Sequence, residues 1–302
     1  MDDSLYRQML LIRVLEEELQ KLCDQGEAGD LHFNRGQEAI AVGVCAALRK
    51  TDYIVCHHRT IAHAVAKGVP LKPLVAELLG KATGICGGRA GEMHINDPEH
   101  RLMFSFQLVG TCLPVSAGLA WAAKYYLESN DIVAVFHGDA ATSNGEWHEG
   151  LNLAVIQKVP LLLVCENNHL AGNVTPEYYI PLGISIRALA QGHGVDATWV
   201  DGNHVDDVAR AVQWTSEKVR KTSQPHLLEM DTTRLSKHKQ GQGDIRSKEE
   251  LAELAKRDPL LYEERRLGID TEVKAQLLAD AQAMVSEAIQ AARSTGVPVG
   301  VI

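Results

Sequence analysis

Four short, β-prone apolar runs from residue 132 onward constrain the possible fold more than any other feature of the sequence. They are Ile132–Phe136, Leu161–Cys165, Thr198–Val200 and His226–Met230, and helix-like sequence separates each run from the next. Strands that alternate with helices in this way predict a doubly wound, mainly parallel α/β sheet. Because neither an internal repeat nor a low-complexity linker interrupts the sequence, we expect residues 1–302 to form a single domain.

Helical periodicity brackets this alternating region at both ends of the chain. Residues 5–19 and 39–48 carry apolar side chains at helical spacing, and a helical pattern returns after Asp258-Pro259. Tyr53–Cys56 is a further short apolar run between two helical stretches. We therefore expect helical extensions at the N- and C-terminal ends of the domain.

Composition excludes several broad classes of protein. With 45% hydrophobic residues the chain can bury a sizeable core, so disorder is excluded as its main state. Lys and Arg number 30 against 39 Asp and Glu, and this net charge of -9 implies neither a nucleic-acid surface nor a membrane surface. The 6 cysteines are scattered, as reduced thiols are, and Met1–Ser4 does not resemble a signal peptide. We expect a soluble protein of the cytoplasm.

The segment between the first two of the four runs carries a helix of its own. Ser143 and Glu146 have the spacing of a capping box, which predicts that the helix begins there. Its expected buried face consists of Trp147, Leu151, Ala154 and Val155. A right-handed crossover through this helix makes the two flanking strands parallel neighbours.

Polar motifs follow these two strands. Gly138-Asp139 comes after the first, and Asn167-Asn168 comes after the second. Asp139 and Asn168 are therefore expected beyond the carboxyl ends of the strands, where open α/β sheets bind ligands. One carboxylate and one amide oxygen suit Mg²⁺ that is also held by ligand phosphates, and the small Ala140 and Ala141 would let backbone N–H groups approach a diphosphate.

Three other segments leave alternatives open. His57, His58 and His63 could form a metal cluster, but we expect no acidic or thiol partner beside them, which disfavours this interpretation. The glycine-rich stretch 80–91 would allow close backbone approach to a ligand or to another subunit. Residues 236–246 offer nothing to a core and are interpreted as a mobile loop, with a plain surface connection as the alternative.

Gly138-Asp139 followed by Asn167-Asn168 resembles the thiamine diphosphate motif. The chain around it is similar to the α subunit of the first component of 2-oxo acid dehydrogenases, with acetoin dehydrogenase α chains as the nearest resemblance. The residues that carry the resemblance, in order, are Tyr6-Arg7, Arg13, Glu16-Glu17, His32, Gly36-Gln37-Glu38-Ala39, His58-Arg59, Gly87-Gly88, Met93-His94, Val109-Gly110, Pro114, Arg234 and His238. The resemblance implies the pyrophosphate-binding module of the thiamine diphosphate-binding fold.

It also implies a set of cofactor ligands. The Asp139 and Asn168 side chains and the Leu170 carbonyl would ligate Mg²⁺, while Arg59 and Arg234 would bind the diphosphate. Further positions implied to contact the cofactor are His58, Gln107, Val109, Gly138, Ala140, Ala141 and His238. Among them, Gln107 and Val109 would meet the aminopyrimidine through backbone groups.

His32 and His238 are the implied catalytic residues. They would face the thiazolium and the substrate, where an imidazole can transfer protons near neutral pH. The family usually has tyrosine at the position of His58, whereas acetoin-type chains have histidine there.

Three positions depart from the family pattern. Ala140 replaces a usual glycine, which is tolerable only if its φ angle is negative. Ile61 stands where histidine is common, so one polar group of the usual site is absent. Lys239 replaces a serine that is phosphorylated in some relatives, and this excludes such regulation here.

The resemblance implies the α subunit of a thiamine diphosphate- and Mg²⁺-dependent 2-oxo acid or acetoin dehydrogenase. Its β subunit would supply the catalytic glutamate in an α2β2 heterotetramer, and the acyl group would pass to the lipoyl group of a transacylase. The alternatives are a two-subunit, transketolase-like carboligase that transfers a two-carbon unit, and a non-catalytic homologue. The sequence leaves the identity of the oxo acid or ketone substrate open.

Overall fold

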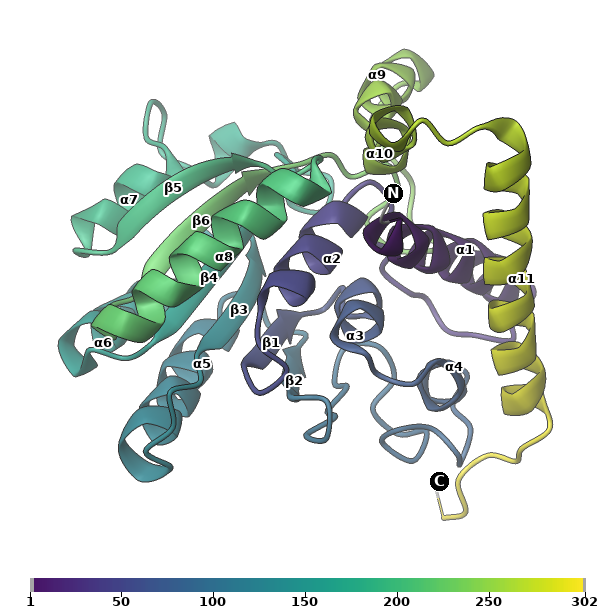
Figure 1. Cartoon of the computed structure of the whole chain (residues 1–302), viewed down its shortest axis with the longest axis horizontal. Helices are drawn as coiled ribbons and strands as arrows, with labels where there is room; N and C mark the ends of the chain where they lie inside the picture. The colour runs from purple at the N-terminus through teal and green to yellow at the C-terminus, as the bar shows by residue number, and fades with distance from the viewer. Residues whose placement is uncertain (1–2, 301–302) are drawn as a thin grey trace.

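A six-stranded sheet forms the centre of the computed structural model, which describes residues 3–300 (Figure 1). Its strands are β1 (Tyr53–His57), β2 (Leu102–Phe106), β3 (Val133–Gly138), β4 (Leu161–Asn167), β5 (Asp196–Asp201) and β6 (His226–Asp231). All neighbouring strands are parallel, in the order β2-β1-β3-β4-β6-β5. The predicted doubly wound α/β sheet is confirmed, and each of the predicted apolar runs falls in a strand except for Ile132, which directly precedes β3.

The strands form because both of their faces are buried. In β3, Val133 and Val135 pack into one hydrophobic cluster, whereas Ala134 and Phe136 pack into another on the opposite face. This arrangement is typical of parallel sheets covered by helices on both sides. β2 was not predicted, because it is an edge strand whose Phe104 remains 38% exposed.

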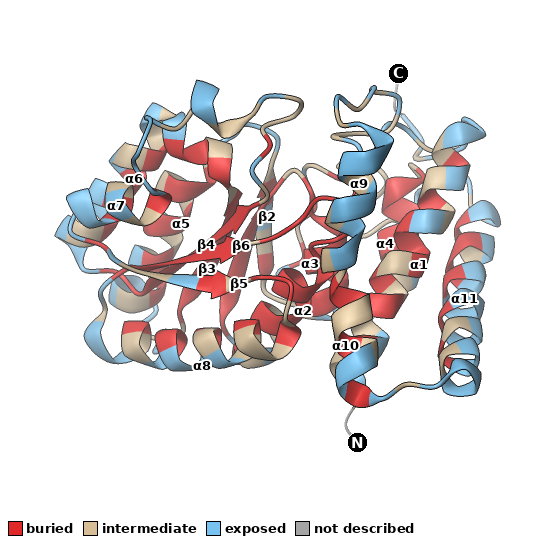
Figure 2. Cartoon of the chain, turned by 90° about the horizontal axis from the view of Figure 1, so that it is seen from above, coloured by how far each residue is buried: buried red, intermediate tan, exposed pale blue. Residues whose placement is uncertain are grey.

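Helices cover both faces of the sheet (Figure 2). One face carries α5 (Cys112–Trp121), α6 (Gly145–Gln157) and α7 (Ile186–Gly192), and the other carries α2 (Glu38–Ala47) and α8 (Val205–Thr222). Beyond α2 lies a further group of helices: α1 (Ser4–Asp24), α3 (Ile61–Lys67), α4 (Leu71–Leu78), α9 (Lys248–Leu254), α10 (Pro259–Leu267) and α11 (Thr271–Arg293). The long helices α1 and α11 pack against each other, as Figure 1 shows.

Short helical turns complete the chain. They are η1 (Ala122–Tyr126), η2 (Asp139–Ser143), η3 (Pro176–Tyr178) and η4 (Ala255–Arg257). Among the described residues, no helix combines the length and the apolar character that crossing a bilayer requires.

The order of the strands determines where a ligand can bind. From β1 the chain moves to β2 on one side, and it then returns to place β3 on the other side of β1. The connections therefore leave the carboxyl ends of β1 and β3 in opposite directions, which opens a crevice between them. β1 is followed by His58-Arg59 and β3 by Asp139, so the crevice is lined by residues that the sequence analysis selected.

The predicted start of α6 is wrong. Asn144, and not Ser143, caps the helix: its side chain accepts the Glu146 backbone N–H at 2.8 Å. Ser143 belongs to η2, and its hydroxyl donates to the Ala140 carbonyl. Of the expected apolar face, Val155 is only partly buried, whereas Trp147, Leu151 and Ala154 are buried.

Residues 236–246 form a loop without a helix or a strand, as predicted. Several hydrogen bonds tie the loop to its surroundings. Arg246 donates to the carbonyls of Arg234 and Ser236, and the Gln240 N–H donates to the Leu31 carbonyl at 2.9 Å. Its mobility stays a prediction.

Candidate functional site

A cavity of about 280 Å³ lies at the carboxyl ends of β1, β3 and β4. The sequence-predicted residues that line it are His58, Arg59, Val109, Gly138, Asp139, Ala140, Ala141, Asn168, Leu170, Arg234 and His238. Two candidates do not line it. Gln107 is exposed after the end of β2, and the His32 ring packs edge-on against the imidazoles of His58 and His238, which do line the cavity.

Asp139 presents a buried carboxylate to this cavity. The side chain is 2% exposed, and the Tyr179 hydroxyl donates to its Oδ2 atom at 2.6 Å. Burial raises the pKa of Asp139, although the hydrogen bond from Tyr179 opposes the rise. Within residues 3–300 no lysine or arginine forms an ion pair with it. A carboxylate buried without a cation is suited to binding a metal ion.

Asn168 and Leu170 lie beside Asp139 where β4 ends. The Asn168 Oδ1 atom accepts the Leu170 N–H at 3.1 Å, and its Nδ2 group donates to Gln37 Oε1 at 2.8 Å. These contacts orient the amide and leave its oxygen on the same side as the Leu170 backbone. The crossover through α6 therefore brings together the three predicted metal ligands at one edge of the sheet.

Arg59 and Arg234 are 4% and 2% exposed, and they line the same cavity. Arg59 donates from Nη1 to the Phe33 carbonyl at 2.9 Å, and its Nη2 lies 3.0 Å from His238 Nδ1. Arg234 donates to the Gly172 carbonyl at 2.7 Å. In the part of the chain that the structure describes, neither guanidinium pairs with a carboxylate.

Burial and neighbouring cations weaken the charged state of both guanidinium groups. Burial, together with the positive charges of Arg59 and Arg246, lowers the pKa of Arg234 to about 9. Burial likewise lowers the pKa of Arg59. Two buried, unpaired cations in one cavity would both be stabilised by a bound anion.

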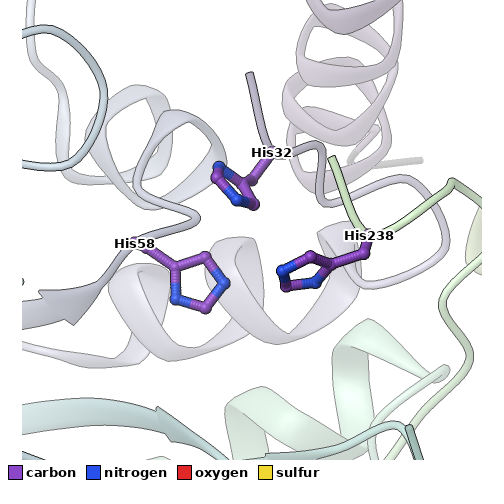
Figure 3. A group of neighbouring side chains, drawn as sticks. All are labelled: His32, His58 and His238. Atoms are coloured by element: carbon purple, nitrogen blue, oxygen red, sulfur yellow. The ribbon is translucent and has the colours of Figure 1, made fainter. Parts of the chain in front are cut away.

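Three histidines from distant segments turn toward one another beside Arg59 (Figure 3). The ring centroid of His32 lies 4.8 Å from that of His58 and 5.1 Å from that of His238. Burial lowers the pKa values of His32 and His238 to about 4, and it lowers the pKa of His58 as well. All three imidazoles are therefore neutral at neutral pH, and His58 Nε2 is buried without a hydrogen-bond partner among residues 3–300. We call this group the open histidine cluster.

The open histidine cluster has the composition of a metal site, since one ligand atom from each ring lies within 4.8 Å of the others. Its surroundings favour a different role. Arg59 Nη2 directs a proton at His238 Nδ1, and the nearby guanidinium of Arg234 adds a second positive charge. A divalent cation placed there would be repelled by both arginines.

A second cluster, which we call the buried histidine cluster, contains His57, His63 and Glu166. Glu166 Oε2 lies 2.8 Å from His57 Nε2, and Glu166 Oε1 lies 2.7 Å from His63 Nε2. The expectation that these histidines lack an acidic partner was wrong. Glu166 is distant in sequence, and the pairing of β4 with β3, and of β3 with β1, brings it to them.

Hydrogen bonds to Arg59 settle where the protons of the buried cluster lie. The Arg59 N–H donates to His57 Nδ1 at 3.1 Å, so the His57 proton is on Nε2 and points at Glu166. His63 Nδ1 lies 3.0 Å from the Arg59 carbonyl and must donate to it. A further proton is therefore held between His63 Nε2 and Glu166. Burial opposes charge on Glu166, but the two imidazoles hold its pKa well below its ordinary value.

Two departures from the expected pattern are accommodated. The φ angle of Ala140 is not positive, so a methyl group is tolerated at that position. Ile61 is fully buried in the hydrophobic core at the start of α3 and does not line the cavity.

The sequence analysis missed four residues at or near the site. They are Gln37, Glu92, Glu166 and Tyr179. Gln37 stands inside a recognised motif, and Glu166 lies between a predicted strand and the Asn167-Asn168 motif, so both positions were usable signals. Tyr179 follows η3 in a connection with no pattern of its own, and nothing local marks it as the partner of Asp139.

The glycine-rich stretch 80–91 approaches a buried carboxylate of its own chain. Glu77 of α4 accepts the backbone N–H groups of Cys86, Gly88, Ala90 and Gly91. A Cβ atom on Gly88 would lie 2.3 Å from the Lys81 carbonyl oxygen, which explains the need for glycine at this close approach.

Comparisons with known proteins match the chain to one kind of protein. The family model described as the dehydrogenase E1 component matches residues 6–299. The chain is 36% identical over 293 residues to the α subunit of acetoin:2,6-dichlorophenolindophenol oxidoreductase from Bacillus subtilis (strain 168), covering 96% of this chain and 87% of the relative. It is 32% identical over 317 residues to the chloroplastic pyruvate dehydrogenase E1 component subunit alpha-3 of Oryza sativa subsp. japonica, covering 98% and 72%. It is also 32% identical over 301 residues to the 2-oxoisovalerate dehydrogenase subunit alpha of Bacillus subtilis (strain 168), covering 96% and 90%.

Proposed function

This chain belongs to the dehydrogenase E1 component family, and from that premise we propose that it is the α subunit that holds the Mg²⁺-diphosphate half of a thiamine diphosphate enzyme. One observation carries the proposal. A buried carboxylate without a cation, Asp139, shares a cavity with two buried guanidinium groups without an anion, Arg59 and Arg234. A diphosphate with its Mg²⁺ supplies both missing charges at once.

The proposed ligands form two groups, one that would bind Mg²⁺ and one that would bind the phosphates. Asp139, the Asn168 amide oxygen and the Leu170 carbonyl would hold Mg²⁺, because hard oxygen ligands suit it. Arg59 and Arg234 would bind the phosphate oxygens. The remaining positions proposed to contact the cofactor are His58, Gln107, Val109, Gly138, Ala140, Ala141 and His238.

Thiamine diphosphate, when bound, supplies the nucleophilic carbon and the electron sink that cleavage next to a ketone carbonyl requires. The chain supplies binding, orientation and proton transfer. His32 and His238 are proposed as the catalytic residues, since neutral imidazoles in the open histidine cluster can accept or release protons near the reacting atoms. The buried position of both arginines excludes water from the diphosphate end.

A β subunit is the proposed partner, in an α2β2 heterotetramer in which it contributes the catalytic glutamate. Two apolar side chains at the mouth of the cavity support a covering partner: Leu108 is 69% exposed and Val109 is 45% exposed. A lipoyl transacylase is the proposed acceptor of the acyl group. A cytoplasmic location is also proposed, supported by the six cysteines, all of which are free thiols.

The test is reductive acylation of a lipoyl domain by the α chain together with its β subunit, thiamine diphosphate and Mg²⁺. Pyruvate, branched-chain 2-oxo acids and acetoin serve as the substrate panel. We expect activity with at least one of them, and none from the α chain alone. Transfer only to an aldehyde would establish the carboligase instead. Failure to bind thiamine diphosphate in calorimetry, with the β chain present, would establish a non-catalytic homologue.

A further inference from the structure

Glu92 contacts His32 at three points and makes no other side-chain hydrogen bond within residues 3–300. Its carboxylate accepts the His32 backbone N–H at 3.1 Å through Oε1 and at 2.9 Å through Oε2. Oε2 also lies 3.1 Å from the ring Nδ1 atom. Glu92 is 4% exposed and His32 is 8% exposed, so water does not replace these contacts.

The turn that precedes Glu92 is held in place. Glu77 gathers the backbone N–H groups of that turn, among them those of Ala90 and Gly91, which directly precede Glu92. Glu77 is itself 1% exposed within α4. The carboxylate of Glu92 therefore reaches His32 from a fixed backbone.

We propose that Glu92 is a positioning residue for His32: it binds the backbone and Nδ1 of this histidine and leaves Nε2 to exchange a proton beside the cofactor. The inference rests on the proposed function for the identity of the reaction. Its geometry is independent of that function. Nε2 forms no hydrogen bond within the described residues, and the ring faces His58 and His238, which line the cavity.

Proton counting shows what Glu92 contributes. One proton lies between Nδ1 and Oε2, and while it is the only proton of the pair, Nε2 is a free base. When Nε2 accepts a second proton, the ring charge is balanced by the carboxylate, or the first proton moves onto Oε2. In either case the pair of Glu92 and His32 gains one proton from the donor, and no proton leaves the pair. Burial raises the pKa of Glu92 well above its ordinary value, which strengthens the pair as a proton acceptor.

The charges around the pair make this contribution necessary. The groups that face His32 are Arg59, Arg234, Lys239, Asp30, His58 and His238. Positive charges exceed negative ones in this set, so an imidazolium at position 32 would be disfavoured without the carboxylate of Glu92.

Glu92→Gln is the decisive variant. In the wild type Oε2 contacts both the His32 N–H and Nδ1, and a glutamine oxygen in its place can accept both bonds. The neutral amide can neither take the Nδ1 proton nor balance the charge of an imidazolium, so Nε2 becomes a weaker base. In the α2β2 enzyme we expect kcat to fall about 10²-fold or more, with KM and the cofactor Kd within about threefold of wild type. Glu92→Gln combined with His32→Gln should be no slower than His32→Gln alone. Glu99→Gln, an exposed change in the same loop, is the control and should leave kcat unchanged.

The second measurement, NMR of the histidine nitrogens, does not depend on enzyme activity. In the full chain with ¹⁵N-labelled histidines, the His32 signals, identified by their loss in His32→Gln, should show Nε2 gaining or losing a proton between pH 3 and 10, a range that includes the pKa of about 4. In Glu92→Gln, Nε2 should gain its proton only at a lower pH than in the wild type. A wild-type His32 that does not titrate in this range, or a Glu92→Gln variant that titrates like wild type, would overturn the inference. A failure of lipoyl acylation by the wild-type enzyme would instead overturn the proposed function.

Discussion

His57 and His58 are neighbours in sequence, yet they belong to different histidine clusters. In the buried cluster, each ring nitrogen of His57 and His63 has a partner, and Glu166 joins the two rings. In the open cluster, His58 Nε2 has no partner, and burial keeps the imidazoles neutral. The comparison indicates that hydrogen bonding to Glu166 gives the buried cluster a stabilising role, whereas the open cluster is left available for proton transfer.

Arg59 connects the two clusters. Its backbone N–H and carbonyl are held by His57 and His63, and its side chain reaches His238. The buried cluster therefore fixes the backbone of the residue that is proposed to bind the diphosphate. Stability on one side of Arg59 supports the geometry of the open cluster on the other.

Removing the shared carboxylate should produce the largest effect. Glu166→Ala leaves two buried imidazoles without their common acceptor, and we expect the free energy of unfolding to fall by about 3–5 kcal/mol. Urea unfolding of the full chain, followed by tryptophan fluorescence, measures the loss.

The matched control is Glu166→Gln. Its oxygen can accept the His57 Nε2–H, and its NH2 group can donate to a neutral His63, so every hydrogen bond is retained without charge. We expect a loss of about 1 kcal/mol or less. A loss as large as that of Glu166→Ala would show that the proton assignment in the buried cluster is wrong.

Substituting adjacent histidines should produce an intermediate effect that differs between the clusters. His57→Phe leaves the Arg59 N–H and one oxygen of Glu166 unpaired, and it should lower the free energy of unfolding by about 1–3 kcal/mol. His58→Phe removes an imidazole whose Nε2 has no partner, and the change should stay within about 1 kcal/mol. Equal losses in urea unfolding would contradict the division into two clusters.

The pH dependence of stability should follow the histidines whose pKa values burial lowers. The pKa values of His32 and His238 are about 4 in the folded chain and near 6.5 when unfolded, so the unfolded chain binds more protons between these limits. Stability that is complete above about pH 6.5 should fall as the pH decreases toward 4. Melting temperatures across this range measure the slope.

The control combines His32→Gln with His238→Gln. This double variant should have a shallower slope than wild type, with the remainder contributed by other histidines whose pKa values burial also lowers, among them His58, His137 and His226. An unchanged slope would mean that the open cluster does not titrate as proposed.

Much of the fold could be predicted from the sequence, because its signals are local. The run from Ile132 to Phe136 is apolar at every position, as a strand buried on both faces must be. The edge strand β2 lacks that signal, and the cap of α6 was assigned one residue too early because Ser143 and Asn144 both suit a helix start. Of the eleven candidates that line the cavity, the motifs after the strands marked Gly138, Asp139, Ala140, Ala141 and Asn168. The other six were selected as cofactor ligands only through a family resemblance: His58, Arg59, Val109, Leu170, Arg234 and His238.

The sequence by itself determined the parallel sheet and the placement of Asp139 and Asn168 at its carboxyl edge, because strand–motif–helix order is written in consecutive residues. Only the tertiary structure decided which carboxylate contacts which histidine. Glu166 reaches His57 across 109 positions of sequence, and Glu92 reaches His32 across 60. Successive side chains at a strand end point in different directions, so the partners of adjacent histidines depend on which strands and turns pack beside them.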